Sequence, residues 1–223
     1  MYLGQAEQDK FVLNVLQEKR NGTFLEIGSN HPIKINNTYL LESKYNWNGI
    51  MLEYDKHFLD LYKKHRPNSI HVIQDATKVD YKTLFEKYKL PFSFDYLQID
   101  LEVRNGSTLQ TLQKLDQDIF DTYKFATITF EHDIYVGNSY NTRSLSRYIF
   151  KKRGYICVFE DINNQGINPY EDWYVHPDLV NMNYVNNLIE RNKIFNVAHS
   201  ITGTTINWEN IQYSSGHHSG SDS

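Results

Sequence analysis

The chain has 223 residues, of which 23 are basic and 27 acidic, so its formal net charge at pH 7 is −4. This length and a hydrophobic content of 40% predict one folded domain with a substantial core rather than a disordered chain. The small negative charge argues against nucleic acid as a partner, and the apolar runs are too short to span a membrane. The single cysteine, Cys157, excludes an internal disulfide and a zinc site of several thiolates, and the lack of a charged and apolar leader predicts a cytosolic protein.

Short apolar segments alternate with helical patterns along most of the chain. An opening helix over residues 7–19 places Phe11, Val12, Val15 and Leu16 on one face. The predicted strands are residues 23–27, 49–53, 69–74, 94–99, 125–130 and 155–160, and the predicted helices are 37–45, 56–64, 81–88, 107–115 and 143–152. Because strands that alternate with helices pair in parallel through right-handed crossovers, this order predicts a three-layer α/β sandwich with a mostly parallel central sheet.

The chain changes character after Asp161. A segment rich in Asn, Gly and Pro leads into the aromatic and acidic run YEDWYVHPDLV, and residues 194–208 are expected to add an edge strand or to pack over the core. Residues 214–223 are only Ser, Gly, His and Asp, so we expect a disordered tail whose His217 and His218 are not metal ligands. The folded domain is therefore predicted to be residues 1–213.

An acidic residue closes each of the first five predicted strands: Glu26, Glu53, Asp75, Asp100 and Glu131. One acid after a strand is common, because Asp and Glu are frequent turn and cap residues. In an open parallel sheet, however, ligands bind at the carboxyl ends of the strands, and all of these ends lie on one edge. A set of carboxylates on that edge therefore predicts a ligand site.

The first turn indicates which ligand this is. In FLEIGSN, Gly28 lets the backbone approach a ligand closely, and Glu53 follows Glu26 by about 27 residues, where nucleotide-binding folds place the acid that accepts from ribose hydroxyls. The chain lacks both GxGxxG and GxxxxGK(S/T), which argues against a pyrophosphate. A nucleoside ligand without phosphate fits better, and S-adenosylmethionine is such a ligand. Its predicted binding residues are Glu26, Gly28, Ser29, Asn30, Glu53, Tyr54, Asp75, Ala76 and Asp100, with Asp75 accepting from the adenine amino group.

Several segments in the same order resemble class I methyltransferases of the FkbM family. They are GQAEQDKFV (4–12), FLEIGSN (24–30), GIMLEYD (49–55), IQDAT (73–77), DYLQIDLE (95–102) and ATITFEHD (126–133). The chain departs from the family at Val103, where a glycine is usual, and in Ser29 and Asn30, which replace further glycines. The resemblance implies a Rossmann-like fold and transfer of a methyl group from S-adenosylmethionine to a hydroxyl of a sugar or a related natural product. Methyltransferase domains of chlorovirus glycan-synthesis proteins are a weaker resemblance.

The densest polar cluster, Glu131-His132-Asp133, follows the fifth predicted strand. A sugar hydroxyl is a weak acid, so a base close to it speeds methyl transfer, and His132 can serve near neutral pH. We therefore predict His132, Asp100 and Asp133 as catalytic residues; the alternative is a polar turn that caps the next helix. Asp100 could also hold a divalent metal together with Glu131 or Asp133.

Residues that could contact an acceptor follow the predicted site. Aromatic rings beside carboxylates are typical of sugar sites, because sugar CH groups pack on rings while hydroxyls pair with acids. The predicted acceptor residues are Glu102, Glu131, Tyr135, Arg143, Asp172, Trp173 and His176. Trp173 could instead be a core residue on an edge strand, Arg143 and Arg147 could form a solvated pair, and Cys157 is expected to be an inert core residue.

Three functions remain open at this stage. The first is an O-methyltransferase whose acceptor is a carbohydrate or glycan, such as rhamnose. The second is a methyltransferase for another small molecule or a protein side chain, since no motif encodes the acceptor. The third is a cofactor-binding scaffold without activity. No pattern in the sequence indicates an oligomeric state.

Overall fold

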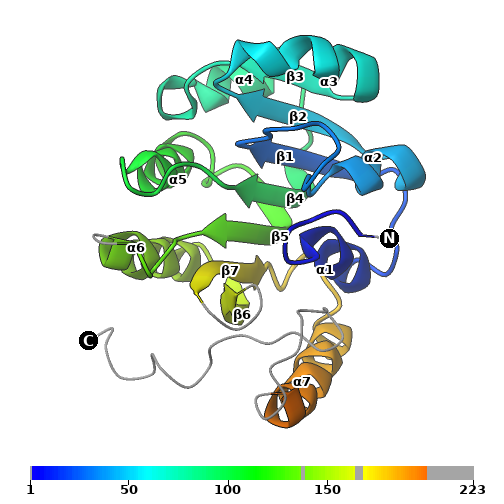
Figure 1. The fold of residues 1–223 in the computed structure, drawn as a ribbon, viewed down its shortest axis with the longest axis vertical. Helices are drawn as coiled ribbons and strands as arrows, with labels where there is room; N and C mark the ends of the chain where they lie inside the picture. The colour runs from blue at the N-terminus through cyan, green and yellow to red at the C-terminus, as the bar shows by residue number, and fades with distance from the viewer. Residues whose placement is uncertain (1, 137–138, 164–167, 200–223) are drawn as a thin grey trace.

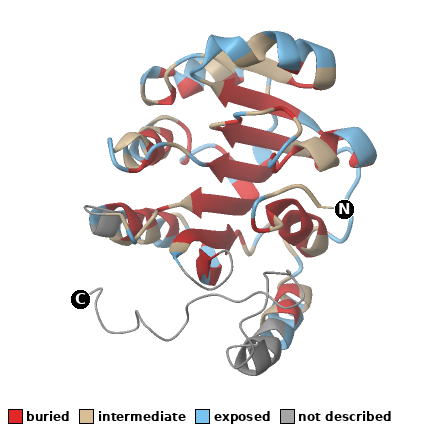
Figure 2. Ribbon diagram, viewed as in Figure 1, coloured by how far each residue is buried: buried red, intermediate tan, exposed pale blue. Residues whose placement is uncertain are grey.

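The computed structural model describes residues 2–136, 139–163 and 168–199. Within them, seven strands form one sheet in the order β3-β2-β1-β4-β5-β7-β6 (Figure 1). The strands are β1 (Thr23–Ile27), β2 (Asn48–Glu53), β3 (Ile70–Ile73), β4 (Ser93–Ile99), β5 (Lys124–Glu131), β6 (Ile156–Asn163) and β7 (Pro169–Val175). The central strands are almost wholly buried (Figure 2), as the continuous apolar runs predicted.

Helices cover both faces of the sheet, so the predicted three-layer sandwich is confirmed. One face packs against α1 (Gln8–Val15), α2 (Tyr39–Tyr45), α3 (Leu59–His65) and α7 (Met182–His199). The other face packs against α4 (Tyr81–Lys87), α5 (Ser107–Asp118) and α6 (Ser139–Lys152). Two short 3₁₀ turns, η1 (Lys56–Phe58) and η2 (Ala76–Lys78), follow β2 and β3.

The strands β1 to β5 pair in parallel, whereas β7 is antiparallel and lies between β5 and β6. No bounds were predicted for this strand, which contains the whole YEDWYV run (170–175). The connection from Asn163 to Pro169 is too short for a parallel crossover of a dozen or more residues, so the chain returns antiparallel. The insertion places the side chains of β7, and not those of β6, directly beside β5.

Two further expectations differ from the structure. The segment from Ile194 to His199 belongs to α7, so an edge strand there is wrong, while residues 200–208 and the tail 214–223 lie outside the described residues. Cys157 is exposed on the outermost strand, β6, and not buried in the core. Within the described part of the chain, no helix combines the length and apolar character that a membrane span requires.

Candidate functional site

A cavity of about 690 Å³ opens at the carboxyl ends of β1, β2, β4 and β5. Its wall includes the predicted residues Glu26, Gly28, Ser29, Asn30, Glu53, Asp100, Glu102, Glu131 and Asp133. The other lining residues are Gln5, His31, Lys34, Ile35, Asn36, Asn37, Gln98 and Leu101. The structure therefore gathers most of the strand-end acids in one place, as expected from parallel strands.

The turn after β1 forms part of the cavity wall and depends on Gly28. This residue has φ 84°, and its N–H donates to the carbonyl of Leu52 at 2.9 Å. A Cβ atom here would lie 1.8 Å from the carbonyl oxygen of Asp100, so only glycine lets the ends of β1 and β4 come this close.

The half-buried carboxylate of Glu53 is held by backbone N–H groups. One oxygen accepts from Asn30 at 2.8 Å, and the other accepts from Tyr54 at 2.8 Å and Asp55 at 3.0 Å. These bonds fix the orientation of the side chain and tie the β1 turn to the end of β2. Oε1 already accepts two hydrogen bonds, but Oε2 accepts only one and has a lone pair left, so the carboxylate can still accept from a hydroxyl group of a ligand.

Glu26 is fully buried, yet it lines the cavity. Its Oε2 accepts from Asn36 Nδ2 at 3.3 Å, whereas Oε1 has no hydrogen-bond partner among the described residues. Burial raises the pKa of Glu26, and the nearby Arg66 opposes that rise. Gln98 Oε1 is likewise buried without a partner on the same wall. Both oxygens lie on the cavity wall, so they are available to accept hydrogen bonds from a ligand that supplies donors.

Three acids lie where β4 and β5 end. Loss of contact with water is the main cause that raises the pKa of both Asp100 and Glu131. The charge of Asp100 raises the pKa of Glu131 further, to about 12, whereas a hydrogen bond with Glu131 lowers the pKa of Asp100. Burial also raises the pKa of Asp133, while a hydrogen bond from Tyr135 lowers it. Two adjacent carboxylates cannot both ionise at low cost, so the Asp100–Glu131 pair retains a proton between its oxygens.

His132 does not reach this cavity, which contradicts its predicted role as the base. The side chain is fully buried, and its Nε2 lies 3.4 Å from Asp172 and 3.5 Å from Asp161. Successive residues of an extended segment point to opposite sides, so His132 faces away from the cavity that Glu131 and Asp133 line.

A buried ion network surrounds His132. Arg143 donates to Asp161 at 2.9 and 2.7 Å, and Arg147 donates to Asp172 at 2.8 and 3.0 Å. Burial acts to raise the pKa of Asp172, but His132 and Arg147 outweigh it and hold that pKa well below its usual range.

These contacts also bear on metal binding. His132, Asp161 and Asp172 each place a possible ligand atom within 4.8 Å of the others. Among the described residues, no other group of three histidines, cysteines or acids comes this close together. Two guanidinium groups already balance the two carboxylates, so the network has no need of a metal cation. Arg143 and Asp172 belong to this network and not to the acceptor site for which they were predicted.

Two other predicted acceptor residues also lie elsewhere. Trp173 is fully buried and packs on Phe11 with ring centres 4.6 Å apart, which supports the core alternative. His176 follows the antiparallel strand β7, so it lies at the opposite edge of the sheet, where its N–H donates to Ala126 and its ring packs on Tyr155.

The remaining predicted residues lie near the cavity without lining it in the structure. Asp75 caps η2 by accepting from the N–H and hydroxyl of Thr77, and the buried Ala76 follows it. Tyr54 is 76% exposed and Tyr135 is 51% exposed, so both rings are open to a ligand that extends beyond the cavity.

The sequence analysis missed the wall formed by the loop between β1 and α2. Of this loop, His31, Lys34, Ile35 and Asn36 line the cavity. The only signal was its position directly after the Gly28 turn, because HPIKINN contains none of the acids on which the prediction relied.

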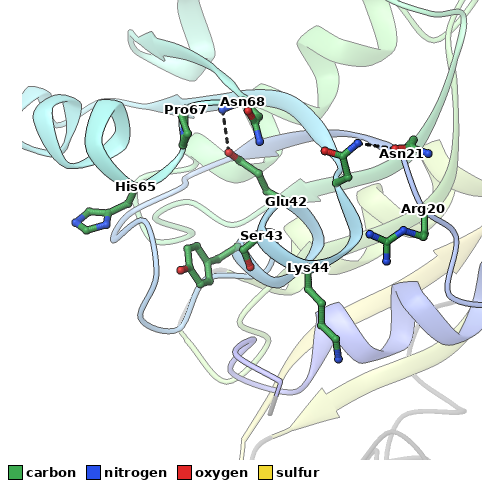
Figure 3. Close-up of a pocket in the computed structure, with 10 residues that line it drawn as sticks. Arg20, Asn21, Glu42, Ser43, Lys44, His65, Pro67 and Asn68 are labelled. Atoms are coloured by element: carbon green, nitrogen blue, oxygen red, sulfur yellow. Dashed lines mark hydrogen bonds between the residues drawn. The ribbon is translucent and has the colours of Figure 1, made fainter.

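A second hollow, of about 510 Å³, lies at the opposite, amino edge of the sheet (Figure 3). Lys44 and His65 line it from the last turns of α2 and α3, where cations offset the helix dipole. Glu42, which also lines it, accepts from the N–H of Asn68 and pairs with Arg66. These contacts explain the polar side chains without a ligand, so the carboxyl-edge cavity is the candidate site.

No protein-family model matches the chain, and no curated protein sequence is detectably similar. Solved structures do share its fold. A methyltransferase from Pyrococcus furiosus aligns with a TM-score of 0.50 and 14% identity, covering 77% of this chain and 82% of that one. The METTL16 MTase domain aligns with a TM-score of 0.50 and 12% identity, covering 75% of this chain and 65% of that one. The chain therefore has the Rossmann-like fold of class I methyltransferases, as the sequence resemblance implied.

Proposed function

We propose that this protein is an S-adenosylmethionine-dependent methyltransferase that methylates a hydroxyl oxygen of a carbohydrate. The observation that carries the proposal is the buried, unpartnered oxygen of Glu26 beside the oriented carboxylate of Glu53, at the carboxyl edge of a class I methyltransferase fold. The carbohydrate acceptor rests on the FkbM resemblance and on the character of the cavity.

The polar groups of the cavity suit this cofactor. Glu26 and Gln98 offer buried acceptors for an ammonium group, and Glu53 offers an acceptor for a ribose hydroxyl. Gly28 lets the turn that carries Ser29 and Asn30 pack directly against the backbone of Asp100. When bound, S-adenosylmethionine would supply a methyl group that an acceptor oxygen attacks, with S-adenosylhomocysteine as the leaving group. The cavity wall also carries six carboxyl groups, Glu26, Glu53, Asp100, Glu102, Glu131 and Asp133, against one lysine, Lys34, so its charge disfavours phosphate even with one proton held by the Asp100–Glu131 pair. An uncharged polyhydroxyl acceptor is therefore favoured over a nucleic acid.

Asp133 takes the place of His132 as the proposed base. It lines the cavity at the end of β5, and its raised pKa makes the carboxylate a better proton acceptor than an ordinary aspartate. The neighbouring Asp100–Glu131 pair can both donate and accept hydrogen bonds because it retains a proton, so it can orient the hydroxyl. The exposed ring of Tyr135 offers a surface for sugar CH groups.

We propose that the reaction needs no divalent metal. Among the described residues, Asp100 and Glu131 have no third carboxylate or imidazole close enough to complete a three-residue group. Activity should therefore persist after exhaustive treatment with EDTA, and loss of activity that Mg²⁺ or Mn²⁺ restores would instead support the metal role of this pair.

The direct test joins a titration to a turnover assay. Wild-type protein should bind S-adenosylmethionine in a calorimetric titration and add one methyl group to methyl-free rhamnose or another deoxy sugar, as seen by mass. Glu53→Ala should weaken cofactor binding by about 1–3 kcal/mol, because charge-assisted bonds to the ribose are lost. Binding without turnover on any sugar would direct the search to other hydroxyl acceptors, and no binding at all would refute the proposal.

A further inference from the structure

Asn36 lies near the end of the loop between β1 and α2, where it is 2% exposed and fixed by its surroundings. Its Oδ1 accepts from the N–H of Tyr39 at 2.8 Å, from Arg66 Nη1 at 3.0 Å and from the N–H of Thr38 at 3.1 Å. Backbone N–H groups and guanidinium groups cannot accept hydrogen bonds, so the amide has only one possible orientation. The other end of the amide, Nδ2, must therefore face the cavity wall.

Arg66 makes this orientation rigid. It is fully buried and donates to Glu42 at 2.8 Å, to the hydroxyl of Thr38 at 2.7 Å and to the carbonyl of Pro32 at 3.3 Å. Glu42 balances its charge and also accepts from Ser69. These bonds join α2, the β1–α2 loop and the segment before β3 into one unit around Asn36.

The Nδ2 end of the Asn36 amide contacts Glu26. Asn36 Nδ2 donates to the carbonyl of Ser29 at 3.1 Å and to Glu26 Oε2 at 3.3 Å. A donor on Oε2 favours the ionised carboxylate and fixes its rotation, which leaves Oε1 as the unpartnered oxygen on the cavity wall. A buried carboxylate oxygen of this kind is best satisfied by a cationic donor.

We propose that Asn36 is a positioning residue that, held by Arg66, orients Glu26 to bind the ammonium group of the cofactor's amino-acid part. The inference rests on the proposed function, since it names a cationic group that S-adenosylmethionine carries. Asn36 acts through Glu26 and is not placed at the reacting atoms. Its segment, residues 31–37, contains no acidic residue. Loss of Asn36 should affect binding of the amino-acid part of the cofactor alone. A general loss of structure would weaken binding of every part of the ligand, so the two effects can be told apart.

Two stable ligands separate these roles. S-adenosylhomocysteine carries the ammonium group, whereas 5′-methylthioadenosine has the same nucleoside and sulfur but no amino-acid part. Asn36→Asp keeps an oxygen for Arg66, Tyr39 and Thr38 but replaces the donor to Glu26 with an acceptor. Calorimetric titration should show affinity for S-adenosylhomocysteine falling about tenfold or more, with affinity for 5′-methylthioadenosine unchanged.

Other variants complete the comparison. Glu26→Gln should show the same selective loss, Glu53→Gln should weaken both ligands because both carry a ribose, and Asn46→Asp at the far edge of the sheet should change neither. Should Asn36→Asp disturb the fold, as judged by its thermal unfolding, Asn36→Ala removes the donor without adding charge and must show the same selectivity. An equal effect on both ligands, or none on either, overturns the role of Asn36. Failure of the wild-type protein to bind either ligand overturns the proposed function instead.

Discussion

Two buried arginine networks flank the candidate site, and they end differently. The network of Arg66 and Glu42 lies beside the end of β1 and extends through Asn36 to Glu26, whose free oxygen is on the cavity wall. The network of Arg143 and Arg147 lies behind the end of β5 and ends at His132, which is buried away from the cavity. The same pairing of guanidinium and carboxylate thus supports a ligand contact on one side and only a backbone turn on the other.

The largest expected effect is on stability, and it should be larger in the Arg66 network. Arg66→Met leaves Glu42 buried without its arginine, whereas Arg143→Met leaves Asp161 with Arg147, whose Nη2 lies 3.3 Å from it. Arg66→Met should lose about 3–5 kcal/mol of unfolding free energy in urea titrations, because an uncompensated buried charge is costly, and Arg143→Met should lose less. Only Arg66→Met should also lower affinity for S-adenosylhomocysteine.

A surface pair provides the control for this measurement. Lys63 and Asp60 lie 3.8 Å apart and are 64% and 96% exposed at their side chains, so Lys63→Met should leave stability almost unchanged. Losses for Arg66→Met and Arg143→Met as small as that for Lys63→Met would show that neither network stabilises the fold.

The next effect concerns catalysis. Asp133→Asn should lower turnover by about 100-fold or more while leaving cofactor affinity intact, because it removes the proposed base. The base must be ionised, and its pKa is raised, so wild-type activity should fall on the acidic side at a higher pH than for an ordinary aspartate. Asp178→Asn, an exposed residue paired with Lys124 at the far edge, is the matched control and should keep full turnover. Turnover of Asp133→Asn equal to wild type would move the base role to the Asp100–Glu131 pair.

The two sides also differ in how far the sequence predicted them. Glu26, Glu53, Asp100 and Glu131 follow strands that pair in parallel with their neighbours, so local patterns and one topological rule were enough to bring them to one cavity. His132 and Trp173 were misplaced because β7 inserts antiparallel beside β5, a pairing between segments far apart in the chain. Asn36 was missed because its role depends on Arg66, 30 residues away. Contacts of this kind have no periodic signature.

A smaller effect tests whether His132 is structural. The ring Nδ1 of His132 accepts from the backbone N–H of Ile134. The backbone N–H groups of His132 and Asp133 both donate to the carbonyl of Tyr170. His132→Asn should therefore loosen the turn and lower turnover about tenfold, through misplacement of Asp133. The pH profile should keep its shape, because the base is unchanged. A profile that loses its acidic limb would restore His132 as the base.

The smallest effect concerns a buried acid that neither network neutralises. Glu171 on β7 lies opposite Glu131 and accepts from Gln8 at 2.7 Å, and no arginine or lysine pairs with it among the described residues. Burial, followed by the charge of Asp100, raises its pKa from the ordinary 4.5 to about 8. Below the ordinary value, the folded and unfolded chains both hold the proton, so the carboxyl adds no pH dependence there.

Between pH 4.5 and about pH 8, the unfolded chain releases the proton of Glu171 while the folded chain keeps it. The free energy of unfolding therefore decreases as the pH rises, until the folded group also ionises. Glu171→Gln cannot ionise, yet it keeps an oxygen for Gln8. Urea titrations at pH 5 and pH 8 should therefore show the variant gaining about 1 kcal/mol or more over wild type at the higher pH. Asp172→Asn should show no such gain, because Arg147 already holds that carboxylate ionised in the fold. If the free energies of unfolding of wild type and Glu171→Gln change equally between pH 5 and pH 8, a cation must neutralise Glu171 in the fold. Glu171 would then not differ from the acids that the arginine networks neutralise.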